Sequence, residues 1–190
     1  MKAATDSAPV AEGGRILLHA CCAPCSAAVV EWLLGAGYRP TVFFSNANIF
    51  PYDEYALRRG ELERFLQAQG VPYAEDTWDH EGWLARVSGL ESEPERGRRC
   101  SACFAFRLER AAQFAAQQGI PLLATTLAAS RWKDLDQVNA AGERAVRLVS
   151  GVTFWARNWR KGGLQERRNQ LLREHAFYNQ QWCGCEFSCQ

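Results

Sequence analysis

Cysteines stand in two distant groups in the sequence. Cys21, Cys22 and Cys25 fall within five positions, and Cys100 and Cys103 stand much further along the chain. Four thiolates suit a tetrahedral zinc ion or a 4Fe-4S cluster, and the softness of sulfur does not choose between them. The adjacent pair Cys21 and Cys22 lacks the two-residue spacer of structural zinc sites, which favours a cluster, with Cys25 as an additional ligand. The alternative is that these cysteines are reduced and serve as small apolar residues of the core.

A further group of cysteines stands near the end of the printed sequence. Cys183 and Cys185 are separated by one glycine, and this spacing gives the small, strained ring of a Cys-x-Cys disulfide, which is easily reduced and suited to electron relay. Alternatively, one or both of these thiols complete the metal site. Cys189 is expected to be a free thiol in a tail.

Several charged or polar residues are candidates for substrate contacts. His19 is a candidate proton donor, with a satisfied histidine at a strand end as the alternative. Lys133 and Asp134 are candidate substrate contacts or helix-capping charges. The basic stretch 155–173 could bind phosphate or be a solvated helix face. Its candidate contacts are Arg157, Arg160, Lys161, Arg167 and Arg168. The tryptophans could stack on unpaired bases, although core packing is the stronger expectation for most of them.

The elements that must position these residues alternate along the chain. Apolar and β-branched runs predict strands at 16–18, 40–45, 71–75, 120–126 and 152–155. Helical periodicity predicts helices at 26–34, 53–69, 81–87, 104–118, 139–148 and 164–178. This order predicts a Rossmann-like α/β fold, a parallel sheet flanked by helices with a C-terminal helical segment. The first cysteines then lie on a strand-to-helix turn at the carboxyl edge of the sheet, where ligands bind, and Cys100 and Cys103 lie just before a helix.

Length and composition limit the class of protein. The 190 residues suit one domain, so we expect a disordered tail over 1–14 and a single domain over 15–190. Eight cysteines are too few for a small disulfide scaffold, and the first residues lack the apolar segment of a signal peptide. We therefore expect a cytoplasmic protein without a membrane span, in which clustered thiols serve metal or redox chemistry. The net charge of +1 does not indicate a partner.

Four motifs together give the chain a family resemblance. HACCAPCS, RCSACFAFRLERAA, TTLAAS and YNQQWCGCEFS stand in the order found in the QueH epoxyqueuosine reductases, the type that does not depend on cobalamin, and the chain resembles this family from about residue 15 to 188. The resemblance implies a nucleotide α-hydrolase-like fold. It implies reduction of epoxyqueuosine to queuosine, the last step of queuosine biosynthesis, at the wobble position of tRNAs with GUN anticodons, those for Asp, Asn, His and Tyr.

The resemblance also implies roles for the cysteines. Cys21, Cys22, Cys100 and Cys103 would hold a 4Fe-4S cluster, and Cys183 with Cys185 would form a redox-active disulfide. Cys25 would be an extra ligand, for the cluster or for an additional iron. The family commonly shows Ser-Pro-His-Lys-Asp after TTL, whereas this chain has Ser-Arg-Trp-Lys-Asp at 130–134, so it lacks the Pro and the His while Lys133 and Asp134 still match.

The residue chemistry fits such a reaction. Removing an epoxide oxygen to leave an alkene needs two electrons and a group that takes up oxide, which a cluster with an accessible iron and a dithiol together supply. An electron donor of unknown identity would restore the dithiol. Basic residues would hold the RNA backbone, so tRNA binding should weaken with salt. Two other classes remain open, a zinc-stabilised RNA-binding module without catalysis and a thiol-disulfide oxidoreductase acting on proteins.

Overall fold

The computed structural model describes residues 14–188 and contains a five-stranded sheet in which every pairing is parallel. The strands lie in the order β3-β2-β1-β4-β5. Their bounds are β1 Arg15–Ala20, β2 Arg39–Phe44, β3 Tyr73–Glu75, β4 Leu122–Thr125 and β5 Thr153–Phe154. The expected tail, apart from Gly14, and Cys189 lie outside the described residues. The predicted parallel sheet is confirmed.

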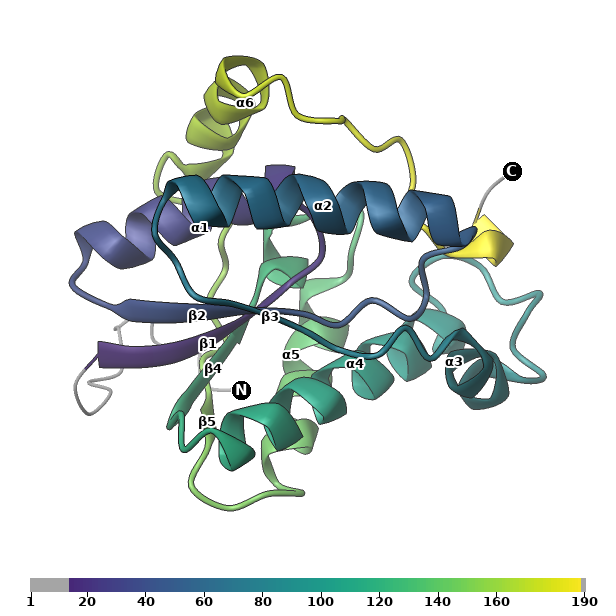
Figure 1. Cartoon of the computed structure of the whole chain (residues 1–190). Helices are drawn as coiled ribbons and strands as arrows, with labels where there is room; N and C mark the ends of the chain where they lie inside the picture. Colours follow the sequence, from purple (N-terminus) through teal and green to yellow (C-terminus); the bar gives the residue numbers. More distant parts are fainter. Residues whose placement is uncertain (1–13, 189–190) are drawn as a thin grey trace.

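Helices cover both faces of this sheet (Figure 1). α1 (Ala23–Gly35), α2 (Tyr52–Ala68) and α6 (Leu164–Glu174) lie on one face. α3 (His80–Val87), α4 (Arg98–Gln117) and α5 (Leu135–Val146) lie on the other. Two 3-10 helices, η2 (Thr126–Ala129) and η3 (Glu186–Ser188), follow β4 and Cys185. The core therefore has three layers, with the sheet in the middle.

The central strands are apolar because helices bury both of their faces. Ile16, Leu17 and Leu18 have no exposed surface, and Leu17 stands in register with Leu123 of β4. Continuous apolar runs of this kind are characteristic of central strands in parallel sheets. This explains why the run at 16–18 could be recognised as a strand without any alternation of polar residues.

The chain reverses its direction across the sheet between β1 and β4. From β1 it builds outward through β2 to β3, and it then returns through α3 and α4 to place β4 on the other side of β1. Such a switch point leaves a crevice at the carboxyl ends of the two strands, where ligands of α/β proteins bind. Cys21 follows β1 and Thr126 follows β4, and the Cys21 backbone N–H donates to Thr126 Oγ1 at 3.1 Å.

Four predicted helix boundaries were wrong for local reasons. α1 begins at Ala23, three residues earlier than expected, because Pro24 is accommodated in its first turn, so Cys25 lies inside the helix. α4 begins at Arg98, so Cys100 and Cys103 lie inside its first turns and do not precede it. α5 begins at Leu135, four residues earlier than expected, because the Asp134 carboxylate caps the helix by accepting from Gln137 N–H. α6 ends at Glu174, not at residue 178, because Ala176 adopts a left-handed backbone with φ of 50°.

The described part of the chain was also searched for membrane spans. Among the helices within residues 14–188, none combines the length and the apolar character that crossing a bilayer requires.

Candidate metal and redox site

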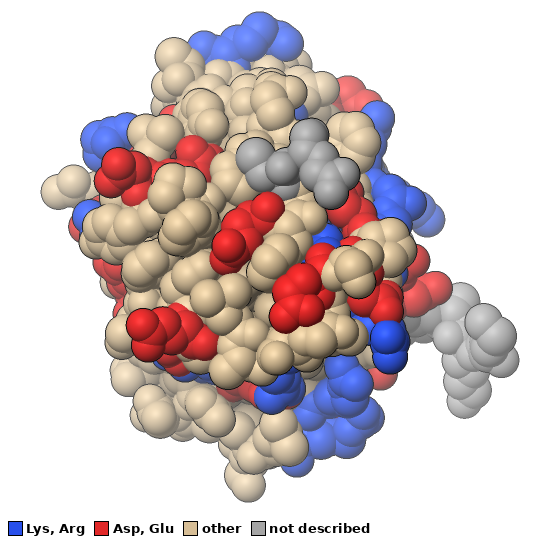
Figure 2. Space-filling view, turned by 90° about the vertical axis from the view of Figure 1, so that its right-hand side faces the viewer, with Lys and Arg blue, Asp and Glu red and all other residues tan. Residues whose placement is uncertain are grey.

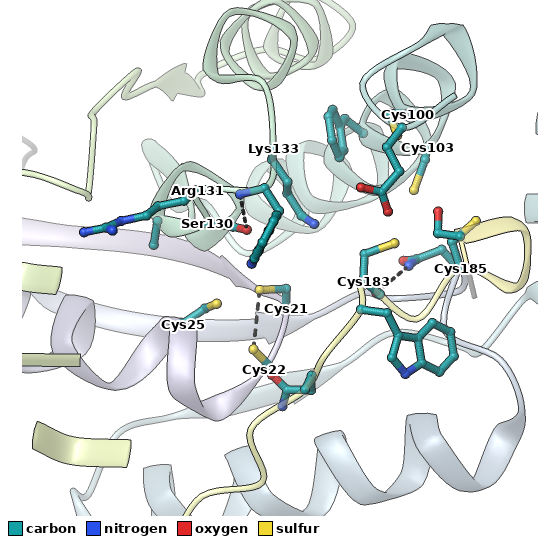
Figure 3. A pocket seen from close by; sticks show the side chains of 18 of the residues that line it. Cys21, Cys22, Cys25, Cys100, Cys103, Ser130, Arg131, Lys133, Cys183 and Cys185 are labelled. Carbon is teal, nitrogen blue, oxygen red and sulfur yellow. Dashed lines mark hydrogen bonds between the residues drawn. The ribbon is translucent and has the colours of Figure 1, made fainter. Parts of the chain in front are cut away.

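One pocket gathers the cysteines of the described chain. Its volume is about 500 Å³, and it opens at the switch point of the sheet. All seven free cysteines within residues 14–188 line it, namely Cys21, Cys22, Cys25, Cys100, Cys103, Cys183 and Cys185. Figure 3 shows them on two sides of the space, the first three on the α1 side and the other four across from them.

The first side of the pocket holds three converging thiols. The sulfurs of Cys21, Cys22 and Cys25 all lie within 4.8 Å of one another, and those of Cys21 and Cys22 are 3.8 Å apart. Cys22 precedes α1 and Cys25 lies in its first turn, so a three-residue spacing brings them to the same side. Because soft thiolates bound to one group must converge in this way, the trio is suited to a metal cofactor.

Hydrogen bonding among these thiols favours one thiolate. The thiols of Cys22 and Cys25 bond to Cys21, which lowers the pKa of Cys21 well below its ordinary value, and the charge of Lys133 and the Thr126 hydroxyl act in the same direction. The same bonding to Cys21 raises the pKa of Cys22 and brings that of Cys25 to about 12. Cys21 is therefore the readiest metal ligand of the three.

The facing side consists of α4 and the C-terminal segment. Cys100 and Cys103 come from the first turns of α4, and neither belongs to the close group of three thiols. Burial raises the pKa of Cys100, and the negative charges of Cys103 and Cys183 add to this effect. The two predicted ligand pairs thus line one pocket from opposite sides, with Cys25 nearer to Cys21 and Cys22 than the α4 cysteines are.

Cys183 and Cys185 form a second coupled pair on that side. A hydrogen bond from Cys185 lowers the pKa of Cys183 well below its ordinary value, and the charge of Lys133 contributes to the shift. Donating this bond raises the pKa of Cys185, which burial raises further. One thiolate beside one protonated thiol is the arrangement from which thiol-disulfide exchange starts.

Hydrogen bonds connect the segment that carries this pair to the loop over residues 46–50. Asn48 Nδ2 donates to the Cys183 carbonyl at 3.4 Å, and Phe50 N–H donates to the Gly184 carbonyl at 2.9 Å. Gly184 has a φ of 94°, and its Cα faces Ile49 so closely that an added Cβ would stand 2.8 Å from Ile49 Cγ1. The loop over residues 46–50 therefore positions the dithiol at the pocket wall.

The pocket lining is strongly basic. It contains one acidic residue, Glu95, and seven basic ones: Arg58, Arg96, Arg99, Arg107, Arg131, Lys133 and Arg168. Lys133 points into the space toward the thiols, whereas Arg131 extends away from it (Figure 3). Figure 2 shows that the face on the side of η3 carries acidic side chains among the basic ones, so the molecule is not basic over its whole surface. The pocket is suited to an anionic ligand.

Two of these arginines are buried charges in the pocket wall. Arg99 and Arg107 are each 2% exposed. Arg107 donates to the Ser45 carbonyl at 3.2 Å and to Asn46 Oδ1. Arg99 donates to the carbonyls of Glu91 and Glu93, each at 2.5 Å. Their hydrogen bonds go to neutral groups, so both positive charges remain available to stabilise negative charge in the pocket.

Two residues predicted as substrate contacts have structural roles in the fold. His19 is completely buried in β1, where Nε2–H donates to the Ser45 carbonyl at 3.0 Å and Nδ1 accepts from the Thr125 hydroxyl at 2.8 Å. Burial lowers the pKa of His19 to about 3, aided by the charge of Arg107, so the ring stays neutral. Asp134 caps α5. Neither residue is part of the pocket lining, whereas Lys133 is.

The basic stretch divides into different environments. Arg168 lines the pocket, but Arg167 pairs with Glu31 of α1 at 2.8 Å and with Glu174 at 3.0 Å. Arg160 donates to the Lys133 carbonyl at 2.7 Å, and the Arg157 guanidinium lies 3.7 Å from the centre of the Trp32 ring. Lys161 is exposed and is not in the pocket lining.

The tryptophans in and after that stretch also lie in different environments. Trp155 and Trp159 are 5% and 2% exposed, which confirms core packing for these two rings. Trp182 lines the pocket, and the Arg58 guanidinium lies 5.4 Å from its ring centre. Trp182, which follows the stretch, is therefore available to a ligand in the pocket.

Sequence reasoning missed much of the pocket wall. Asn48, Arg99 and Arg107 were not among the predicted site residues, although all three line the pocket. A signal existed for two of them, because Arg99 directly precedes Cys100 and Asn48 lies in the Asn-rich loop after the second strand. The Asn48 side chain is buried, and its Oδ1 has no hydrogen-bond partner.

A parallel α/β sheet with a thiol-rich, basic pocket at its switch point defines a class of protein, a cysteine-dependent metal and redox protein that accepts an anionic ligand. Comparison with known proteins gives the particular family. The family model described as "Epoxyqueuosine reductase QueH" matches residues 16–190. The chain belongs to this family, whose members are oxidoreductases that act on tRNA.

Relatives named epoxyqueuosine reductase QueH match most of the chain. The protein from Histophilus somni is 43% identical over 174 residues, which cover 92% of this chain and 72% of the relative. The Haemophilus influenzae protein is 42% identical, with 92% and 71% covered. The Thermotoga maritima protein is 34% identical, with 92% and 90% covered. The resemblance stated from the motifs is confirmed.

A solved structure supports the fold. The U34-tRNA thiolase NcsA from Methanococcus maripaludis, with its [4Fe-4S] cluster, superimposes with a TM-score of 0.54 at 16% identity, over 94% of this chain and 63% of the thiolase. At this identity the likeness concerns the fold alone. It confirms the predicted nucleotide α-hydrolase-like architecture.

Proposed function

We propose that this chain reduces epoxyqueuosine to queuosine at the wobble position of tRNAs with GUN anticodons, those for Asp, Asn, His and Tyr. The convergence of all seven described cysteines on one basic pocket carries the proposal, because it joins metal ligands, a dithiol and an anion-binding wall in one place. We also propose that residues 15–190 act as one domain, since the pocket draws on segments from both ends of the described chain.

The proposed cofactor is a 4Fe-4S cluster held by Cys21, Cys22, Cys100 and Cys103. The donor set fits such a group, because the thiols are soft ligands and Cys21 favours its thiolate form. Cys25 is the additional ligand, for the cluster or for an additional iron, and its sulfur lies within 4.8 Å of those of Cys21 and Cys22. When bound, the cluster supplies electrons and a Lewis acid for the epoxide oxygen.

The reaction balances with the dithiol as the two-electron source. Both C–O bonds of the epoxide break, a C=C bond forms, and the oxygen leaves as water with two protons. The Cys183 thiolate and the Cys185 thiol give up two electrons and one proton and form a disulfide, which an external donor of unknown identity reduces again, and the second proton comes from Lys133. Lys133 Nζ, whose charge reaches both Cys21 and Cys183, is placed to give a proton to the departing oxygen.

The target nucleotide need not be extracted from a duplex. An anticodon loop is single-stranded, so turning one nucleotide into a pocket costs less than it does in a helix. Arg168 and the other basic residues of the lining would hold phosphates, while Asn48 Oδ1 is a buried acceptor that is free to bind a hydroxyl or amine of the substrate. The pocket thus offers both charge and one directional polar contact.

Anaerobic purification of wild type and of Cys25→Ser, Cys100→Ser and Ser101→Ala tests the cofactor. Iron, sulfide and zinc are counted, and absorption is recorded. We expect about four irons and four sulfides in wild type and in the Ser101 control. Cys100→Ser should lose the cluster, whereas Cys25→Ser should lose at most part of the iron. Stoichiometric zinc without colour would support the zinc-stabilised binding module instead.

Activity is then assayed on epoxyqueuosine-containing tRNA. A reduced protein without an external donor should convert up to one equivalent and stop, and Cys185→Ser should fail to turn over with a dithiol donor. Full multiple-turnover activity of Cys185→Ser would refute the relay role. Thiol-disulfide exchange with proteins that survives loss of Cys21 and Cys100 would support the oxidoreductase alternative.

A further inference from the structure

Trp132 has the most exposed of the large apolar side chains described. It is 76% exposed, and it also belongs to the lining of the cysteine pocket. An indole that keeps so much surface in water forgoes the burial that usually stabilises a tryptophan. A ring in this position is therefore available to a partner at the mouth of the pocket.

The backbone beneath this ring is held by several hydrogen bonds. Arg96 Nε donates to the Trp132 carbonyl at 3.1 Å, and Arg96 Nη2 donates to the Arg131 carbonyl at 3.2 Å. Trp132 N–H donates to Ser130 Oγ at 3.3 Å, and Arg160 Nη2 donates to the Lys133 carbonyl at 2.7 Å. The exposed ring thus stands on a fixed loop, so little backbone ordering is needed when it binds.

Charges flank the ring on both sides. Lys133 points into the pocket and Arg131 points out of it (Figure 3). A nucleotide bound in the pocket has neighbours in the RNA chain that stay outside, together with their phosphates. A cation on each side of an exposed aromatic ring is the combination by which proteins hold single-stranded RNA, with charge for the backbone and a flat ring for a base.

We propose that Trp132 stacks on the unpaired base next to the wobble nucleotide and so holds the anticodon loop while that nucleotide is in the pocket. This inference rests on the proposed function, because it takes the anticodon loop as the substrate. Stacking on an aromatic ring tolerates any base, so Trp132 would contribute affinity without selecting among the four tRNAs.

Binding of a synthetic anticodon stem-loop with guanosine at the wobble position tests the inference without requiring catalysis. Two further RNAs carry an abasic site, one directly 5′ and one directly 3′ of that position. Wild type is compared with Trp132→Ala, Trp132→Phe and the control Leu148→Ala, which removes another exposed side chain outside the pocket lining. Surface changes of this kind leave folding nearly unaffected.

Trp132→Ala should weaken binding of the intact stem-loop about 5- to 100-fold, whereas Trp132→Phe should retain most of the affinity and Leu148→Ala all of it. One of the two abasic RNAs should bind wild type more weakly by a similar factor and should show no further loss with Trp132→Ala. With epoxyqueuosine-containing tRNA, the same variant should raise KM and leave kcat nearly unchanged.

Unchanged binding by Trp132→Ala would overturn the stacking role, and so would equal losses on the intact and both abasic RNAs. In either case normal binding by wild type would leave the proposed function standing. Wild-type protein that fails to bind any of the stem-loops would overturn this inference, and failure to convert epoxyqueuosine-containing tRNA as well would overturn the proposed function with it.

Discussion

Replacing Gly184 by alanine should destabilise the turn that positions Cys183 and Cys185. Its φ of 94° lies in the left-handed region, where a side chain costs about 1–2 kcal/mol. The new Cβ would also stand 2.8 Å from Ile49 Cγ1 and 3.2 Å from Ile49 Cβ, and overpacking of this kind costs about 1–3 kcal/mol. The smaller entropy of the unfolded alanine chain offsets about 0.4–1 kcal/mol. We expect a net loss of about 2–4 kcal/mol.

Gly151 offers a matched control. Its φ of 76° is also left-handed, but an added Cβ meets nothing within 4 Å. Gly151→Ala should therefore cost only about 1 kcal/mol, which is the backbone term less the entropic offset. The difference between the two variants isolates the contact with Ile49. Urea denaturation of the reduced, metal-free proteins measures both free energies of unfolding.

A double-mutant cycle with Ile49→Ala makes the test sharper. Ile49→Ala alone removes buried methyl groups and should cost about 2–5 kcal/mol. Because it also relieves part of the clash, the double variant should be more stable than additivity predicts by about 1–2 kcal/mol. If Gly184→Ala and Gly151→Ala lose the same free energy and the cycle shows no coupling, the turn does not rest on Ile49 and the argument for a positioned dithiol fails.

Charged and titratable groups, most of them at the pocket, give four further expectations. Burial raises the pKa of Glu61, so this carboxyl contributes stability below its unfolded value near 4.5 that is lost as pH rises through its folded value. Glu61→Gln should therefore show a smaller fall in urea midpoint between about pH 5 and pH 7.5 than wild type, and equal falls would contradict this. Because the pKa of Cys183 is lowered, its labelling by iodoacetamide, read by peptide mass spectrometry, should slow less between pH 8.5 and pH 6.5 than the roughly 50-fold expected of an ordinary thiol, and a fall as large as that would refute the thiolate. Lys133→Met should lower kcat about 100-fold or more while changing stem-loop affinity less than tenfold, and an unchanged kcat would remove the proton-donor role. With three phosphate contacts, stem-loop binding should weaken about 20-fold between 50 and 200 mM salt, and a salt-independent affinity would exclude phosphate binding by the pocket.

The sheet could be predicted because its signals are local. The apolar run before Cys21 and the helical pattern after it fix a strand-to-helix turn, and right-handed crossovers then bring the later strand ends to the same edge. The helix ends were harder to predict, because they depend on single residues such as the Asp134 cap and the left-handed Ala176. Each of these features acts at one or two positions, where it overrides the helix propensity of the neighbouring residues.

The pocket wall could be predicted only in part, because it depends on contacts between distant segments. A mid-helix arginine is normally exposed, and Arg107 is buried only because Ser45 and Asn46 accept its hydrogen bonds from another loop. In the same way, the sequence places Arg167 in a basic stretch, but in the fold an ion pair with Glu31 of α1 neutralises its charge. Ion pairs between residues so far apart in the chain leave no pattern in the sequence.

The basic pocket has a consequence for how a polyanion would approach the molecule. The chain has nearly equal numbers of basic and acidic residues, 22 and 21, yet the pocket lining takes seven of the basic ones and one of the acidic ones. The remaining residues therefore include more acidic than basic ones, and Figure 2 shows acidic and basic side chains interspersed on one face. The basic charge that gathers in the pocket lining attracts a polyanion at short range, although the net charge of the chain is close to zero. In a protein that is almost neutral overall, attraction of this kind acts close to the pocket and is weak at longer range.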